Sequence, residues 1–327
     1  MTIYDIAREA GVSASMVSRV INNKPGVAAE KRKKIQKLLE ENHYVPNEMA
    51  RSLVTSSTRM VGILVTDIRH EDQLAGANYI TRELRTYGYT GWIYICGGTD
   101  KDRVEGLHDM ARHNVHAAVL MGSKFQSKAV EQAIVKYMPD IPVFLLNGYL
   151  NLPNVYGVLA DIENGFRECT ELMLKKGREH PVLICDAPIP TTCQKEAGYL
   201  GAMREAHKEP VIYRQVAGSF QDGYETATRI LQEHPETDCM MFSLDIMACG
   251  ALRSLWEKSV SVPEQIAIVG CDNTTVSKIY MPQLTTIDTV LMDCSVTIAH
   301  QLTDCIEGRE TNHKTILSTN FIRRETT

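Results

Sequence analysis

The first 95 residues of this 327-residue chain contain no cysteine, and all nine cysteines lie at or after Cys96. None of them forms a Cys-x-x-Cys pair, and an odd number cannot close completely into disulfides. This pattern argues against a disulfide framework and favours reduced, buried thiols, the usual state of free cysteine. His108, His113 and His116 are close in sequence but lack the spacing of a metal-ligand set, so no metal site is expected.

Long apolar runs are also missing. No run approaches the roughly 18 residues that cross a bilayer. The amino-terminal segment MTIYDIAREAG is charged and amphipathic, unlike the apolar core of a signal peptide. We therefore expect a cytoplasmic protein with no membrane partner, folded into two or three domains of roughly 100–150 residues each.

Signatures of catalysis are absent from the sequence. It contains no G-x-S-x-G, G-x-G-x-x-G, phosphate-loop or H-E-x-x-H motif. An enzyme is therefore not expected, and neither a catalytic residue nor a cofactor is assigned.

Basic charge gathers at the amino-terminal end. Residues 1–60 hold ten Lys and Arg against six Asp and Glu, a net charge of +4, whereas the whole chain carries −5, which leaves −9 on the remainder. A basic segment on an acidic body indicates contact with a polyanion. The run from Lys31 to Lys37 fits a solvated helix face equally well, so charge alone leaves both interpretations open.

Three short helices are predicted in this basic segment. The first covers residues 2–10, where apolar residues recur at helical spacing and Thr2 and Asp5 match a capping box. The second covers residues 13–22 and the third residues 28–42. The first two, joined by a short glycine-containing turn, form a helix-turn-helix.

The second of these helices has an unusual outer face. A helix that only supported a core would carry Glu and Lys there. Its inner face is apolar, whereas its outer face carries short hydrogen-bonding side chains and one arginine, Arg19. Side chains of this kind fit a DNA groove.

A further short helix is predicted at about residues 47–55, within YVPNEMARSLVTSST. It has little apolar surface to bury, and a helix of this length is marginal alone. It therefore needs a partner, either a second copy of itself or DNA. A hydroxyl-rich linker follows it.

Strand-like and helix-like segments alternate from Val61 onward. Helical patterns of 10–18 residues separate eight runs that are apolar at nearly every position: MVGILVTD, GWIYICGG, HAAVLMGS, IPVFLLNG, HPVLICDA, VIYRQVAG, DCMMFSLD and QIAIVGCDN. Such runs indicate parallel strands buried on both faces. The predicted fold class is a multidomain protein with an all-α helix-turn-helix head and an α/β body of two parallel-sheet subdomains.

Several of these strands end in polar side chains. Ligands of open parallel sheets bind beyond the carboxyl ends of the strands, which predicts a polar cleft there. Each polar residue could instead cap a helix, and capping is the favoured role for Asp245. The residues concerned are Asp67, Asn147, Asp186, Asp245 and Asp272.

The segments TIYDIAREAGVS, VSRVINN and YVPNEMARSL, together with the pattern G-x-D-N…P-x-L-T-T-I after Ile266, resemble the lactose-repressor/galactose-repressor family of bacterial regulators. The resemblance implies a head over residues 1–58, with a hinge helix near 47–55, and an effector-binding and dimerisation body over 59–327. The body would resemble periplasmic sugar-binding proteins, with three strands crossing between its subdomains. One subdomain would take residues 59–158 and 290–314, the other 159–289 and 315–327.

The same resemblance places the second helix in the major groove and a pair of hinge helices in the minor groove. There Leu53 would act as an apolar wedge that kinks the duplex. An ion pair of Arg19 with Asp5 or Glu9 is the alternative to its DNA contact. The implied DNA-binding residues are Thr2, Ser13, Ala14, Ser15, Ser18, Arg19, Asn22, Tyr44, Asn47, Ala50, Arg51 and Leu53.

The implied effector-binding residues are Asp67, Gln73, Asn147, Lys195, Phe220, Asp245 and Asp272. Three features depart from the family pattern. DIRHEDQLAG replaces an Asn-Pro-aromatic-aromatic loop, Leu244 replaces Asn, and Lys195 stands where most members have Arg. A lysine cannot form the planar, bidentate contacts of arginine. We therefore expect an unusual or charged effector rather than a neutral hexose.

The predicted function is sequence-specific DNA binding in transcription regulation, as a repressor controlled by a small-molecule effector such as a sugar or related metabolite. The protein would act as a homodimer on palindromic double-stranded operator DNA, because readers of this kind match two-fold half-sites. Two alternatives stay open: a solute-binding protein with no DNA role, and an effector-independent regulator.

Overall fold

The structure, a computed structural model, describes residues 1–21, 23–44, 59–215 and 217–327. The chain divides into two compact units, residues 1–58 and 59–327. No helix within the described ranges is long and apolar enough to cross a membrane. The predicted hinge helix at about residues 47–55 lies outside the described residues.

In the described part of the head, three helices surround a small core. They are α1 (Ile3–Ala10), α2 (Ala14–Ile21) and α3 (Ala29–Glu41), which confirms the three predicted helices to within about two residues at either end. The capping box at α1 is also confirmed, since Asp5 N donates to Thr2 Oγ1 and Thr2 N donates to the Asp5 carboxylate. The buried apolar side chains that hold the helices together are Ile6, Ala7, Ala10, Val17, Val20 and Ile35.

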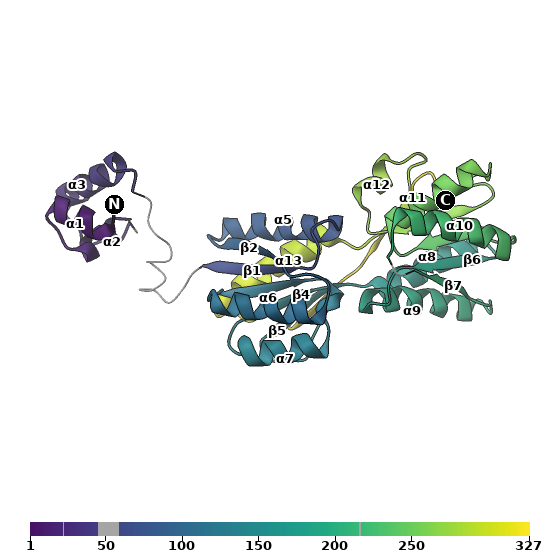
Figure 1. The fold of residues 1–327 in the computed structure, drawn as a ribbon, viewed down its shortest axis with the longest axis horizontal. Coiled ribbons are helices and arrows are strands. Elements are labelled where there is room, and N and C mark those ends of the chain that lie inside the picture. Colours follow the sequence, from purple (N-terminus) through teal and green to yellow (C-terminus); the bar gives the residue numbers. More distant parts are fainter. Residues whose placement is uncertain (22, 45–58, 216) are drawn as a thin grey trace. The chain divides into compact units, whose positions relative to one another are not determined.

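The body contains two six-stranded sheets (Figure 1). The first has the order β11-β5-β4-β3-β1-β2 and is parallel throughout. Its strands are β1 (Met60–Val65), β2 (Thr90–Ile95), β3 (Ala117–Met121), β4 (Val143–Leu146), β5 (Val155–Ala160) and β11 (Lys314–Leu317). One face packs on α5 (Glu71–Thr86) and α13 (Leu291–Ile306), the other on α6 (Asp100–Arg112) and α7 (Lys128–Tyr137).

The second sheet has the order β12-β10-β9-β8-β6-β7, with only the β10–β12 pair antiparallel. Its strands are β6 (Pro181–Cys185), β7 (Val211–Arg214), β8 (Cys239–Phe242), β9 (Ala267–Cys271), β10 (Thr285–Asp288) and β12 (Asn320–Ile322). The helices α8 (Ile162–Lys175) and α9 (Pro190–Glu205) cover one face, and α10 (Phe220–Glu233) and α11 (Asp245–Glu257) the other. The short helix α12 (Thr275–Ile279) follows β9. The predicted fold class is confirmed.

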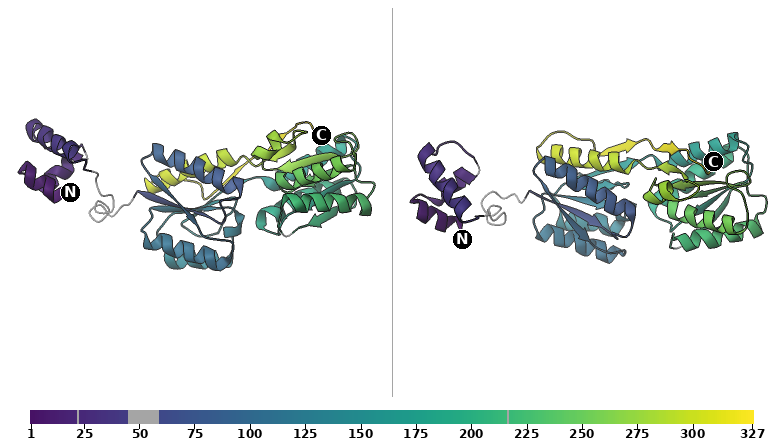
Figure 2. Two further views of the ribbon diagram at one scale, coloured as in Figure 1. Left: turned by 45° about the horizontal axis from the view of Figure 1, so that its top comes forward. Right: turned by 90° about the horizontal axis from the view of Figure 1, so that it is seen from above.

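The chain passes three times between the two subdomains, after β5, after β10 and after β11 (Figure 2). The first and third crossings were expected at residues 158 and 314. Strand β5 ends at Ala160 and β11 at Leu317, so the chain leaves the first subdomain a few residues later.

Four strands were not among the eight predicted from apolar runs. They are β5, β10, β11 and β12. Strands β11 and β12 are short edge strands with no fully buried residue, and β10 buries two threonines, Thr285 and Thr286. Strands β10, β11 and β12 have no continuous apolar run, because their polar side chains either face solvent or form internal hydrogen bonds. Strand β5 (VYGVLA) is a buried apolar run that the sequence analysis did not pick out.

Candidate functional site

The first candidate surface is the outer face of α2. Ser15 and Arg19 are exposed there, and Ser18 is half-buried. Arg19 Nη1 donates to Pro25 O at 3.4 Å. Neither alternative ion pair of Arg19, with Asp5 or with Glu9, is present among the described residues, and Asp5 pairs with Arg8 at 3.6 Å. The guanidinium therefore stays at the surface of the head.

Several other predicted DNA-binding residues have structural roles in the head. Thr2 is the capping residue of α1, and Ser13 Oγ accepts from Met16 N at 3.3 Å at the start of α2. Ala14 and Tyr44 are not fully outward, since both pack partly against the head core. The small Ala14 and the amphipathic Tyr44 can each pack partly against the core and still reach the surface of the head. The remaining predicted residues, Asn22, Asn47, Ala50, Arg51 and Leu53, lie outside the part of the chain that the structure describes.

The basic run lies on α3 and mixes structural with solvated side chains. Arg32 Nη2 donates to Lys24 O at 2.5 Å, and Lys34 Nζ donates to Ala10 O at 3.0 Å. These two residues therefore connect α3 to the rest of the head. Lys31 and Lys33 are exposed. Arg32 and Lys34 therefore help α3 pack in the head, and only the other lysines of the run, such as Lys31 and Lys33, present exposed positive charge.

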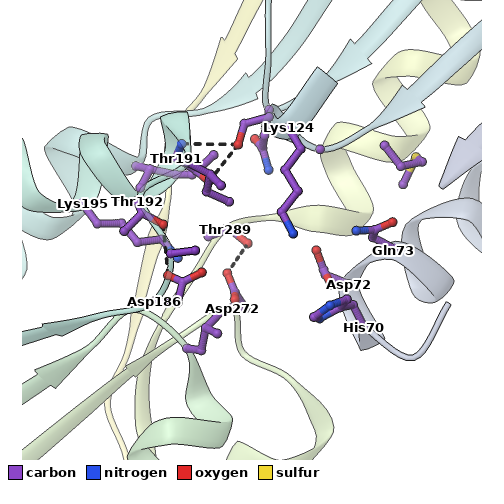
Figure 3. Close-up of a pocket in the computed structure, with 18 of the residues that line it drawn as sticks. His70, Asp72, Gln73, Lys124, Asp186, Thr191, Thr192, Lys195, Asp272 and Thr289 are labelled. Atoms are coloured by element: carbon purple, nitrogen blue, oxygen red, sulfur yellow. Dashed lines mark hydrogen bonds between the residues drawn. The ribbon is translucent and has the colours of Figure 1, made fainter. Parts of the chain in front are cut away.

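The second candidate site is a cavity of about 200 Å³ between the two subdomains of the body (Figure 3). Four predicted effector residues line it. Gln73 on α5 and Asn147 after β4 come from the first subdomain, and Lys195 on α9 and Asp272 after β9 come from the second. The structure thus brings together residues that lie up to 200 positions apart, at the carboxyl ends of parallel strands, where such folds bind ligands.

The first-subdomain side of the cavity is fixed by local hydrogen bonds. The Gln73 side chain is buried, and its Oε1 accepts from Thr66 N at 2.7 Å, which ties α5 to the end of β1. Asn147 has a φ of 53°, and its Oδ1 accepts from Ala160 N at 2.9 Å at the end of β5. Both amides therefore use their oxygen internally.

Lys195 and Asp186 organise the opposite side. Lys195 is buried, and its Nζ donates to Ser243 O at 2.6 Å. Asp186 Oδ1 accepts from Thr192 Oγ1 at 3.0 Å and from Ser243 Oγ at 2.8 Å. Burial alone would lower the pKa of Lys195, but the neighbouring acidic groups, including Asp272 and Asp186, raise it, so the side chain stays protonated.

Two carboxylates face each other across the cavity. Asp272, with a φ of 98°, has only a long contact from Thr289 Oγ1, at 3.4 Å, and one from the adjacent thiol. Asp72 extends from α5 into the same space (Figure 3). Asp72 is an exposed residue. The walls of the cleft limit solvation of its carboxylate and, with the like charge of Asp272, raise the pKa of Asp72, whereas the nearby charges of His70 and Lys195 oppose this.

Three predicted effector residues do not line this cavity. Asp67 forms a bidentate ion pair with Arg69 and is not among the residues that line the cavity. Phe220 is the first residue of α10 and packs partly against the core beside α11. Asp245 is buried and accepts hydrogen bonds from Thr274 and Thr286, so it neither caps its own helix α11 nor faces the cavity.

Sequence reasoning missed several residues that line the cavity. Asp186 was recognised at a strand end but not assigned to the effector site. Most of those not recognised come from helix starts and a 3₁₀ turn, and Thr289 directly follows β10, a strand that was not predicted. The only sequence feature that pointed to any of them was the segment DIRHEDQLAG, which departs from the family pattern and contains two of these residues. The missed polar residues are His70, Asp72, Ser123, Lys124, Thr191, Thr192 and Thr289.

No group of His, Cys, Asp and Glu in the described ranges is arranged to hold a metal ion. The ring of His108 packs at a tilt against Tyr137, and that of His113 packs at a tilt against Trp92. All nine cysteines are free thiols, and six are buried as expected. Cys193 is exposed, because it lies on the outer face of α9, and two others are half-buried.

Comparison with family models gives two matches. Residues 2–47 match the description "Bacterial regulatory proteins, lacI family", and residues 170–327 match "Periplasmic binding protein-like domain". The first match covers the helix-turn-helix, and the second covers most of the second subdomain with its cavity residues.

Curated relatives align over nearly the whole chain. An "HTH-type transcriptional regulator" of Lachnoclostridium phytofermentans is 26% identical, with 100% of this chain and 99% of the relative covered. The catabolite control protein A of Priestia megaterium is 28% identical, with 93% of this chain and 92% of the relative covered. A solved structure of the lac repressor dimer bound to operator and an anti-inducer superposes with a TM-score of 0.91 at 22% identity, over 100% of this chain and 98% of that one.

Proposed function

Because the chain belongs to the lactose-repressor/galactose-repressor family of bacterial transcription regulators, we propose that its α2 helix reads operator DNA and that a small molecule in the body cavity controls that binding. The observation that carries the first part is the exposed Arg19 on a helix whose other outward side chains are short. An arginine in the major groove forms hydrogen bonds with guanine, and one good contact contributes about 1–3 kcal/mol of discrimination.

The experiment compares Arg19→Ala with Arg8→Ala. Both remove one exposed arginine from the head, but Arg8 lies on α1 and pairs with Asp5. Operators are first selected from random DNA with the full chain, and affinities are measured for selected and scrambled duplexes at matched salt. Arg19→Ala should lower affinity for the selected operator by about 1–3 kcal/mol, or about 5- to 150-fold, and reduce discrimination. Arg8→Ala should change both duplexes alike. Equal discrimination by Arg19→Ala and the parent would contradict the proposal.

We propose that the protein is a homodimer, because the two heads of a dimer would match the two half-sites of a palindromic operator. The first subdomain supports this arrangement at its edge strand β2, where Ile93 and Ile95 are 39% and 54% exposed. The second subdomain also exposes Trp256, Ile279 and Met281. Apolar side chains on an open sheet edge favour association, because an uncovered edge strand pairs readily with another chain.

The effector site is proposed to be the cavity that Gln73, Asn147, Lys195 and Asp272 line. We propose no catalytic role for it. Replacement of Asp272 by Ala should abolish the effect of a ligand on operator affinity and leave operator binding itself intact. Thermal-shift screening of sugars, sugar acids and nucleosides identifies such a ligand, because a molecule that binds the folded state raises its stability by mass action.

A further inference from the structure

The cavity is bounded by direct hydrogen bonds between the two subdomains. On one side, Thr275 N and Oγ1 donate to Glu71 Oε1 at 2.9 and 2.6 Å. On the other, Ser123 Oγ lies 3.0 Å from Thr191 Oγ1. Glu71 and Ser123 belong to the first subdomain and the two threonines to the second, so these bonds hold the walls of the cavity close together.

The Glu71–Thr275 contact brings two acidic residues near each other. Asp72 follows Glu71 directly on α5, and Asp272 precedes Thr275 by three residues. Both carboxylates line the 200 Å³ cavity and also the two grooves that adjoin it. Within the described part of the chain, neither has an ion pair, and Asp72 makes no side-chain hydrogen bond to another side chain. A like-charged pair in this position opposes closure of the cleft unless a cation or a shared proton lies between its members.

The two lysines that line the cavity supply only part of the balancing positive charge. Lys195 Nζ is fixed to Ser243 O, and its charge lies near both Asp272 and Asp186, so it offsets part of the negative charge of each. Lys124 extends toward Asp72 from the 3₁₀ turn after β3 (Figure 3), but its ammonium forms no ion pair with any described residue. Three carboxylates, those of Asp72, Asp186 and Asp272, and two lysine ammonium groups line the cavity, so a positive charge on the ligand would balance the lining.

The rest of the lining favours hydroxyl groups. Lys195 is buried, with 5% of its surface exposed. Its Nζ has three N–H donors but only one acceptor, Ser243 O, among the described residues, so two donors are left for a ligand. Asn147 uses its oxygen internally and keeps its NH₂ free for a ligand. None of the described lining residues is Phe, Tyr or Trp. Such a surface matches a polar, non-aromatic ligand, and the cavity volume lies below the roughly 300–1,000 Å³ of drug-sized sites.

We propose that the cavity binds a small polyhydroxylated ligand that carries a protonated amino group, with the size and chemistry of an amino sugar, and that this ammonium lies between Asp72 and Asp272. The inference rests on the effector-binding role proposed above. An ammonium donates three charge-assisted hydrogen bonds and so can contact both carboxylates at once. Because the carboxylates belong to different subdomains, such a ligand binds the closed form better than an open one, which is the requirement for a ligand that shifts a conformational equilibrium.

The test uses matched ligands on the full chain. D-glucosamine and D-galactosamine are compared by calorimetry and thermal shift with the parent hexoses, with their N-acetyl forms and with the corresponding uronic acids. Each amino sugar has the same ring and all but one of the hydroxyls of its parent hexose, so the comparison isolates the effect of the positive charge. At least one amino sugar should bind tenfold or more tightly than its hexose and its N-acetyl form. Uronic acids should not bind better than hexoses.

Asp72→Asn supplies the second arm of the test. It should lower affinity for the amino sugar at least tenfold and leave the weak binding of the hexose unchanged. Asp140→Asn, at an exposed position between α7 and β4, makes the same charge change away from the cavity and should leave both affinities unchanged. Lys124→Met removes the only lining cation without a partner among the described residues, so amino-sugar binding should persist in it.

Failure of this inference can be told apart from failure of the proposed function. Equal binding of amino and neutral sugars, tighter binding of a uronic acid that depends on Lys124, an unaltered amino-sugar affinity in Asp72→Asn, or no binding by any amino sugar would each overturn the inference. The proposed regulator would still stand if the full chain bound a selected operator. Loss of operator binding by the parent chain would instead contradict the proposed function.

Discussion

Asp245 should make the body less stable as the pH rises from about 4 to about 7. Its side chain is 1% exposed, and its carboxylate accepts from Thr274 N and Oγ1 at 2.7 and 2.8 Å and from Thr286 Oγ1 at 2.6 Å. Gly270 leaves room for it, since a Cβ there would lie 2.2 Å from Asp245 Oδ1. Burial, with a smaller contribution from Asp272, raises the pKa of Asp245 to about 7, although the hydrogen bonds oppose this.

The raised pKa determines whether the free energy of unfolding rises or falls with pH. In the unfolded chain the carboxyl titrates near pH 3.8, so between that pH and about 7 the folded state keeps a proton that the unfolded state has lost. The free energy of unfolding is therefore highest below pH 4, falls as the pH rises through this window and levels off above pH 7. At about 1.36 kcal/mol per pKa unit, the interval from 3.8 to about 7 corresponds to about 4 kcal/mol.

Asp245→Asn isolates this contribution. The amide is uncharged at every pH, its oxygen can accept from Thr274, and its NH₂ can donate to the Thr286 hydroxyl. Urea denaturation of parent and variant is followed by circular dichroism from pH 5 to pH 8. The stability of the parent relative to Asp245→Asn should fall by about 2–3 kcal/mol over this range, because about two of the roughly three pH units of the window lie within it. A difference that stays constant with pH would refute the reasoning, and Asp140→Asn should show that constancy.

Three further outcomes are expected. Gly250→Ala should destabilise the body by about 1–3 kcal/mol or more in urea, because its Cβ would lie 2.0 Å from Phe220 O on α10, whereas Gly201→Ala, whose Cβ meets nothing closer than 3.8 Å, should be neutral or stabilising. Ile95→Asp on the edge of β2 should shift sedimentation from dimer toward monomer, and an unchanged dimer would exclude that edge from the interface. Leu53→Ala should reduce operator bending in a gel-phasing assay, and an unchanged bend would reject the wedge assigned to it by family resemblance.

Most of the fold could be predicted because its elements have strong local patterns. The apolar runs of β1, β3 and β9 are buried on both faces, and a strand of this kind leaves little doubt about a parallel sheet. Strand β10 shows where this reasoning fails. It buries Thr285 and Thr286, whose hydroxyls hydrogen-bond to other parts of the body, and nothing in four residues of sequence reveals those partners.

The effector cavity could be predicted only where strand ends define it. Asn147 and Asp272 follow buried parallel strands, and the carboxyl ends of such strands meet at one edge of a sheet. Asp245 follows a strand in the same way but turns toward β10, because Gly270 leaves space beside it. The strand-end pattern is therefore the same for a residue that faces the cavity and for one that is buried behind it. Only the neighbouring strand distinguishes them.

Asp72 shows a different limit. The local sequence predicts that Asp72 lies on a helix, but its role in the cavity depends on Asp272, which lies 200 residues away and in the other subdomain. The two carboxylates line one cavity, whose walls are held together by contacts such as Glu71–Thr275. A charge pair of this kind acts on the equilibrium between open and closed forms: when empty it opposes closure, and with a cation between its members it favours closure. The same two side chains would therefore determine both which ligand binds and how strongly that ligand changes the shape of the body.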